Sequence, residues 1–163
     1  MNELCPTWNL ALAWLWILCG FLSGLGLGLG FHREDWLGGY TSHQRRLYRL
    51  GHISFFGLGL ANWMFHSTAS LLGTRTGWIA LASGLFIVGA LTMPLCCLWT
   101  AHRPAVRGCF AVPVVSLVVG AAIVFAYTLQ LAGSVVALDR TASARRAETG
   151  KSPIGYPEIT HHE

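Results

Sequence analysis

The chain has 163 residues, of which 53% are hydrophobic and only 11% are charged, whereas an ordinary soluble domain has roughly 25% charged residues. This balance excludes an ordinary soluble domain and indicates a small membrane protein. The net charge of +4 does not require a nucleic-acid partner, because a few arginines beside membrane spans serve orientation and contact with anionic lipid. We therefore expect the lipid bilayer to surround most of the chain.

Four uncharged runs predict four transmembrane helices. The runs are Leu4–His32, Leu50–Thr74, Thr76–His102 and Gly108–Leu138. Each is longer than the roughly 20 residues that cross about 30 Å of hydrocarbon as a helix. We expect an all-α integral membrane protein in which helices at about residues 8–31, 44–72, 78–100 and 110–133 form an antiparallel bundle within residues 1–138. The polar residues 139–163 are expected to be a flexible C-terminal tail when alone.

Basic residues predict the orientation of these helices. Six arginines lie in residues 31–49 and 101–107, and the opposite side carries Arg75 and four basic residues of the tail. Four of the six follow the first helix, whose flanking charge usually dominates. We therefore predict that both termini lie outside. The ratio of one Lys to ten Arg points to a bacterial gene, and so to the inner (cytoplasmic) membrane. Met1–Thr7 lacks Lys and Arg, so we expect the first helix to be retained rather than cleaved as a signal.

The first predicted helix contains overlapping G-x-x-x-G patterns through Gly20, Gly24 and Gly28, with Gly26 and Gly30 beside them. Such spacing removes side chains from one face and lets a neighbouring backbone or a flat ligand approach closely. Close packing is the simpler interpretation. The same face is also a candidate for docking onto the helices of a partner.

Local signals predict three further features. Gly38 and Gly39 indicate a turn in the connecting segment Phe31–Arg49. Pro94 lies near the end of the third helix, where it is expected to free a backbone carbonyl and bend the chain. The five cysteines are expected to serve mainly as small apolar packing residues.

The second predicted helix carries a polar stripe. Arg45, His52, Gly59 and His66 recur every seven residues and drift by only about 20° per step on a helix. His52 and His66 would therefore face the same way at a separation of about 21 Å. Asn62 lies close enough to His66 to share its surroundings. Ionisable side chains within a span favour a functional interpretation.

The H-x13-H spacing of His52 and His66 resembles that of the histidine-bearing helices of the cytochrome b family, where it places ligands for two b-type haems stacked across the membrane. The resemblance covers one helix of four, and no other span repeats the spacing. It implies that His52 and His66 ligate haem iron, with His32 or His102 opposite His52. The second ligand for His66 would be Met or another residue, or it would come from a twofold-related copy or a different subunit.

Arg45 and Arg49 precede His52 by one to two helical turns and have two interpretations. Guanidinium groups at this level would pair with haem propionates. The same groups also suit lipid phosphates, which are always present at a membrane surface. Lipid contact is the simpler of the two.

Two functions remain open from the sequence. The first is a small accessory subunit of a membrane complex in electron transfer, holding a b-type haem or a quinone. The second is a structural or assembly protein without a cofactor, in which the histidines form ordinary hydrogen bonds. A metal site in the loop, built from His32, Glu34, Asp35 and His43, is a less economical third interpretation. No catalytic motif is recognised, so we expect no catalytic activity and a dependence on other membrane subunits or a homodimer.

Overall fold

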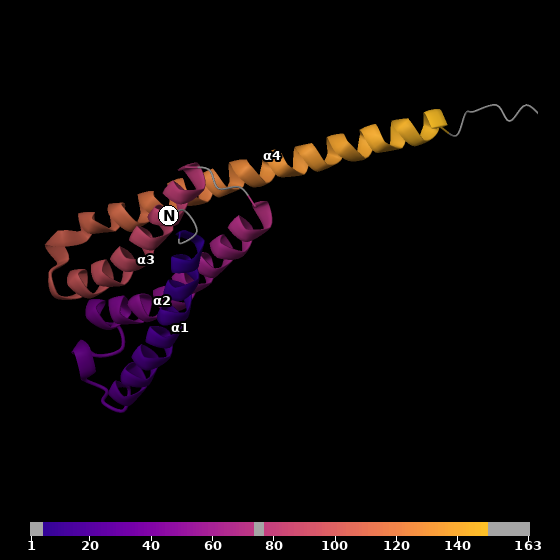
Figure 1. Ribbon diagram of the computed structural model, residues 1–163. Helices are drawn as coiled ribbons and strands as arrows, with labels where there is room; N and C mark the ends of the chain where they lie inside the picture. The colour runs from indigo at the N-terminus through magenta and orange to yellow at the C-terminus, as the bar shows by residue number, and fades with distance from the viewer. Residues whose placement is uncertain (1–4, 74–76, 150–163) are drawn as a thin grey trace, which may run out of the picture. The chain divides into compact units, whose positions relative to one another are not determined.

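The computed structural model describes residues 5–73 and 77–149, which are almost entirely helical (Figure 1). The α-helices are α1 (Cys5–Gly30), α2 (His43–Leu72), α3 (Gly77–His102) and α4 (Ala111–Thr149). Two 3-10 helices, η1 (Trp36–Gly38) and η2 (Pro104–Phe110), precede α2 and α4. The chain divides into two units, residues 1–126 and 127–163, and each is described by itself. The all-α prediction is confirmed for the described residues.

The bounds of α1, α2 and α3 lie within three residues of those predicted. α4 differs, because it ends at Thr149 instead of near residue 133. Residues 134–149 contain neither Gly nor Pro, and they are rich in Ala and Arg, which favour helix. Residues 139–149, assigned from the sequence to the tail, are therefore helical. The remainder of the predicted tail lies outside the described residues.

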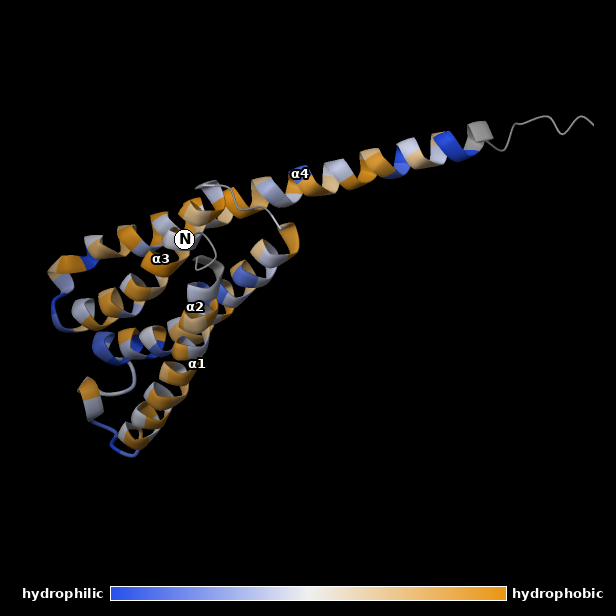
Figure 2. Cartoon of the chain, in the orientation of Figure 1, coloured by the Kyte–Doolittle hydropathy of each residue, from blue (hydrophilic) through white to orange (hydrophobic). Residues whose placement is uncertain are grey.

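Within the part of the chain that the structure describes, three helical segments are long and apolar enough to cross a membrane: Thr7–Gly30, Gly77–His102 and Pro104–Arg146. α2 is not among them, although its 30 residues exceed the length that a span requires. Its mean hydropathy is lowered by the arginines of its first turns and by His52, Asn62 and His66. Figure 2 shows hydrophobic residues along most of α1 and α3, and hydrophilic ones in the connection that leads into α2.

The first unit buries a few polar side chains between its helices and exposes many large apolar ones. Asn9 and Asn62 are 0% exposed, and the Asn9 amide donates to Oδ1 of Asn62 over 2.8 Å. The Ser83 hydroxyl donates to Oδ1 of Asn9 over 2.5 Å, and the Asn62 amide donates to the Leu58 carbonyl over 2.9 Å. These bonds join α1, α2 and α3 through one buried cluster. Unpaired amides there would be costly, so the pairing fixes how the three helices align.

A second buried hydrogen bond replaces the backbone hydrogen bond that Pro94 removes from α3. Pro94 has no N–H, so the carbonyl four residues earlier, that of Ala90, loses its helical donor. The Trp16 indole N–H of α1 donates to this oxygen over 3.0 Å, and both residues are buried. The predicted free carbonyl is therefore present, and a side chain from another helix satisfies it.

These bonds set the direction of α1 and α3. Asn9 and Trp16 lie seven residues apart on α1, and their partners Ser83 and Ala90 lie seven apart on α3. The residue numbers of both partners therefore rise together from one bond to the next, so the two helices run parallel. A seven-residue step returns almost to the same helix face, so a single stripe of α1 faces α3.

α2 runs antiparallel to α1, as two close approaches show. A Cβ placed on Gly20 would lie 2.7 Å from the Phe56 ring, and one on Gly59 would lie 3.1 Å from the Ala13 carbonyl oxygen. The residue number on α2 thus rises as the number on α1 falls. α3 and the first part of α4 are related in the same way, since Gly89 faces Leu117 and Gly120 faces Phe86.

The connection between α1 and α2 contains a tight turn of three residues with backbone angles in the left-handed region. Leu37, Gly38 and Gly39 have φ values of 54°, 79° and 87°, a region that glycine adopts without strain. Ser42 then caps the N-terminus of α2: its hydroxyl oxygen accepts from the Arg45 N–H over 3.1 Å, and its hydroxyl donates to the Leu37 carbonyl. The predicted Gly38–Gly39 turn is confirmed.

Replacing Trp16 by Phe should destabilise the fold by about 1–3 kcal/mol, because the buried Ala90 carbonyl would lose its donor. Pro94→Ala restores a backbone N–H at position 94, so the Trp16→Phe loss should shrink in that background. The free energy of unfolding of the four variants in mixed detergent micelles measures the coupling. Equal losses in both backgrounds would contradict this role of Trp16.

Candidate functional site

The polar stripe of α2 is the surface that packs against α1. Successive members contact residues near or on α1 that are also seven positions apart. The pairs are Arg45 with Phe31, His52 with Gly24 and Gly59 with Ile17. The stripe therefore forms a helix–helix seam, and its seven-residue period matches that of two helices in sustained contact.

His52 is held in one orientation by α1. Its Nδ1 lies 2.9 Å from the Ser23 hydroxyl oxygen, and the Ser23 hydroxyl donates to the Gly20 carbonyl over 3.0 Å. A hydroxyl has one proton, so Nδ1 is the donor to Ser23, and Nε2 of the neutral ring carries the lone pair. The ring meets Phe56 edge to face at 5.5 Å between centroids.

Three glycines of α1 leave space that a ring from a neighbouring segment occupies. A Cβ on Gly24 would lie 2.9 Å from Cε1 of His52, and one on Gly30 would lie 2.7 Å from the Trp36 ring. Gly20 seats Phe56 in the same way. A Cβ on Gly26 or Gly28, in contrast, would meet nothing within 4 Å. The prediction of close packing is confirmed at Gly20, Gly24 and Gly30. Only Gly26 and Gly28 leave a surface on which a partner helix could dock.

The remaining predicted ligands lie elsewhere. Nε2 of His102, at the exposed end of α3, lies 2.9 Å from the Tyr48 hydroxyl. His32 is exposed in the connection after α1, and His43 is the exposed first residue of α2. His66 is half-buried two heptads beyond His52. The structure thus gives His52 and His102 different hydrogen-bond partners. Among the residues that the structure describes, no group of three or more His, Cys, Asp or Glu is placed to hold a metal ion.

Arg45 and Arg49 are engaged by aromatic rings at the start of α2. The Arg45 guanidinium lies 4.5 Å from the centroid of the Phe31 ring and 5.4 Å from that of Tyr40. The Arg49 guanidinium lies 4.8 Å from the same Tyr40 centroid. These cation–π contacts hold both charges beside one exposed ring.

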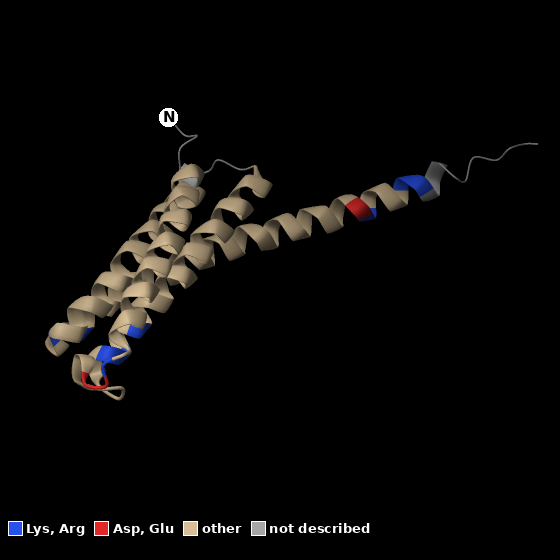
Figure 3. Ribbon diagram, turned by 90° about the horizontal axis from the view of Figure 1, so that it is seen from below, with Lys and Arg blue, Asp and Glu red and all other residues tan. Residues whose placement is uncertain are grey.

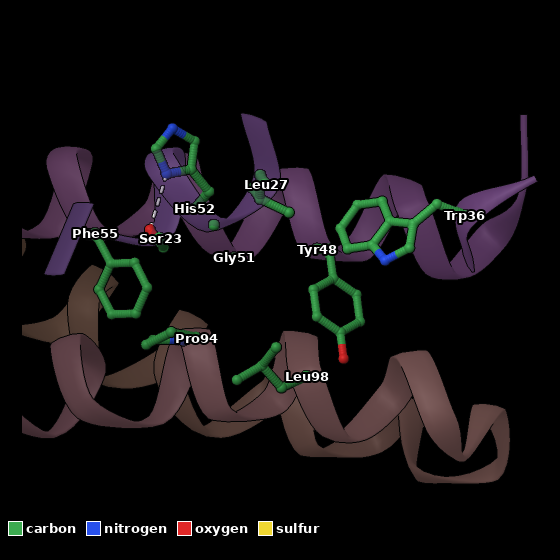
Figure 4. A pocket seen from close by; sticks show the side chains of 10 residues that line it. Ser23, Leu27, Trp36, Tyr48, Gly51, His52, Phe55, Pro94 and Leu98 are labelled. Carbon is green, nitrogen blue, oxygen red and sulfur yellow. Dashed lines mark hydrogen bonds between the residues drawn. The ribbon is translucent and has the colours of Figure 1, made fainter. Parts of the chain in front are cut away.

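A cavity of about 360 Å³ lies between α1, η1, α2 and α3. This volume falls at the small end of the roughly 300–1,000 Å³ of small-molecule sites. Its walls are mostly apolar, and Figure 4 shows Phe55 at one end, Trp36 and Tyr48 at the other, and Pro94 and Leu98 along one side. The full lining is Ser23, Gly26, Leu27, Trp36, Tyr48, Gly51, His52, Phe55, Pro94 and Leu98.

His52 borders this cavity but its ring is turned from the centre. Figure 4 shows the imidazole directed away from Pro94 and Leu98, with Nδ1 bonded to Ser23. The lone pair on Nε2 suits axial ligation of iron, since a ligating histidine usually donates its other N–H to a neighbour. However, the Cβ position of Gly24 lies only 3.5 Å from Nε2. A haem in the cavity would therefore lie on the wrong side of the ring.

The described cysteines fit the packing role expected of them. Cys19, Cys96, Cys97 and Cys109 are free thiols. Cys97 is fully buried, and its Cβ lies 3.4 Å from the Cβ position of Gly51. The Cys96 thiol donates to the Cys109 carbonyl over 3.3 Å. Cys109 thereby joins η2 to α3.

Sequence reasoning missed several partners. Asn9 and Ser83 complete the buried cluster of Asn62, and Trp16 pairs with the carbonyl freed by Pro94. A polar residue within each of three apolar runs was the available signal for the first cluster. Ser23, which orients His52, gave a similar signal, but the sequence did not show which helix faces it.

A scan against protein-family models and searches of curated proteins and of solved structures found no match. The function therefore has to be inferred from the residues of this chain.

Gly24→Ala should destabilise the protein by about 1–3 kcal/mol, because the new methyl group overlaps His52. Gly28→Ala is the matched control, and it should be neutral or stabilising by up to ~1 kcal/mol, since its methyl group meets open space and favours helix. The loss from Gly24→Ala should fall when His52 is also replaced by Ala. Unfolding free energies measure all four variants, and equal effects at Gly24 and Gly28 would contradict the seam.

Proposed function

We propose that all four helices cross the bilayer as an antiparallel bundle, including α2. The polar groups that lower the hydropathy of α2 have partners on its neighbours: Asn62 bonds to Asn9, and His52 bonds to Ser23. Large apolar side chains such as Trp14, Phe21 and Leu25 are exposed on α1, where lipid would cover them. A helix whose polar groups are paired internally is tolerated in the hydrocarbon region.

The charged end of the first unit faces the cytoplasm in this proposal. Figure 3 shows the charged residues of that unit gathered at one end of its helices. Six arginines and two carboxylates lie in residues 31–49 and 101–107. An excess of Arg in cytoplasmic connections sets orientation in a bacterial inner membrane. Both termini would then lie outside.

Within this membrane setting, the chain acts as a small accessory subunit that binds a quinone ring and has no catalytic activity of its own. The cavity beside His52 is the single observation that carries this function. Its aromatic and aliphatic walls suit a flat apolar ring, and the Trp36 N–H is a suitable donor to a quinone oxygen. The open face at Gly28 is available to a partner subunit.

Quinone suits the cavity better than haem for two reasons. The cavity volume of about 360 Å³ accommodates a single ring more readily than a porphyrin with its substituents. The quinone also needs no bond from His52, whose ring is turned towards α1. The lone pair on Nε2 is the one observation that favours haem, so haem ligation by His52 or His66 is kept as a second candidate.

Gly26→Leu should weaken quinone binding at least about tenfold, or ~1.4 kcal/mol, because Gly26 lines the cavity and its added side chain meets no protein atom near Cβ. Gly28→Leu is the matched control: its Cβ position is equally open, but Gly28 does not line the cavity. Labelling of the purified protein by a photoreactive short-chain quinone, competed by unlabelled quinone, gives the affinities. Equal affinity in both variants would contradict the site, and absence of labelling in the native protein would favour the cofactor-free alternative.

The haem candidate is tested by absorption of protein purified from haem-replete cells. A haem protein should show a Soret band that shifts on reduction and that His52→Ala removes. His66→Ala separates the two predicted ligands. A colourless preparation would overturn haem binding and would leave the quinone proposal unaffected.

A further inference from the structure

The guanidinium groups of Arg45 and Arg49 both lie beside the ring of Tyr40, and no described carboxylate forms an ion pair with either of them. The first turn of α2 contains no acidic residue, so the helix dipole adds to the positive potential there. Among the residues that the structure describes, no carboxylate forms an ion pair with Arg45 or Arg49.

Arg45 is also buried with one donor unused. Its side chain is 5% exposed, and its Nε is buried without a hydrogen-bond partner in the described part of the chain. Guanidinium is rarely buried without an acceptor, since the lost hydration is not replaced. The Phe31 and Tyr40 rings hold the position of the charge, but a ring gives Nε no acceptor oxygen.

We propose that Arg45, Arg49 and Tyr40 form a binding site for a phosphate-bearing anion at the membrane surface. Phosphate oxygens pair with the planar guanidinium fork through two parallel hydrogen bonds. A phosphate beside Tyr40 would bring acceptor oxygens and a counter-charge to both arginines, whose guanidinium groups lie next to this ring. Tyr40 is 65% exposed, so an approaching headgroup meets this ring first.

The position of the site favours a lipid as the source of the phosphate. Phe31 directly follows α1, and Arg45 lies in the first turn of α2, at the level where an apolar helix meets its polar connection. Trp36, Tyr40 and Tyr48 lie around this level, and aromatic residues of this kind concentrate at membrane interfaces. Basic pockets between helices at this depth bind anionic headgroups.

The site is separate from the proposed quinone site. Neither Arg45, Arg49 nor Tyr40 lines the cavity. Loss of lipid binding would therefore leave quinone labelling intact, and failure of the quinone proposal would leave the anion site standing.

The test compares three single substitutions in the full-length protein in nonionic detergent at about 0.15 M salt, where exposed charges are screened beyond about 8 Å. Arg45→Gln and Arg49→Gln should each weaken binding of short-chain phosphatidylglycerol at least about fivefold, the worth of one well-placed cation beside an anionic headgroup. Arg46→Gln removes the same charge from an exposed neighbour and should change binding less than about twofold. Native mass spectrometry measures the bound lipid.

Two further arms identify the ligand and guard against misfolding. Inorganic phosphate is titrated alone and as a competitor, and the lipid should bind at a concentration where inorganic phosphate does not compete. Competition at equal concentration would overturn the lipid as the source. Arg49→Gln keeps the result decisive if Arg45→Gln fails to fold, because Arg49 is only half-buried. Equal losses in all three variants, or no binding by the native protein, would overturn the site.

Discussion

Pairing of polar groups between helices is the constraint on which the rest of this structure depends. An apolar surrounding offers no water to an unpaired amide or carbonyl, so each one must find its partner within the protein. Asn9, Asn62 and Ser83 do so across three helices, and the Trp16 indole serves the carbonyl that Pro94 frees. Apolar contacts between helices would tolerate sliding, whereas these bonds accept one register. They therefore fix α1 against α3 at two levels.

With α1 fixed, the polar stripe of α2 has a defined position. Arg45, His52 and Gly59 lie on the face that meets α1, because the small residues there leave room for rings and backbone. Gly24 accommodates His52, and the Ser23 hydroxyl oxygen accepts a hydrogen bond from its Nδ1–H. The hydrogen bond to Ser23 thus favours one tautomer of the neutral ring.

The sequence predicted the helices well because long apolar runs and their Gly, Pro and charged borders are local signals. It also predicted the free carbonyl at Pro94, since that follows from proline chemistry alone. It did not predict the partner, Trp16, because contacts between distant segments leave no local mark. The seven-residue stripe identified a special face of α2, but periodicity does not distinguish a face that binds haem from one that packs on a helix. α4 extends beyond its predicted end because polarity was taken as a boundary, while Ala and Arg continue a helix readily.

The cavity follows from the same packing rules. Away from the Asn9 cluster, the contacts near the cavity involve Gly26, Gly51 and Pro94, residues with little or no side chain to fill the space between three helices. Cys97 occupies part of the space beside Gly51, whereas no protein atom lies within 4 Å of the Cβ position of Gly26. Larger side chains at these positions would close the gap at little cost to helix formation, and close packing normally leaves few voids larger than a water molecule. The apolar space beside the oriented His52 therefore follows from the small residues that line it, and it is where we propose that a quinone binds.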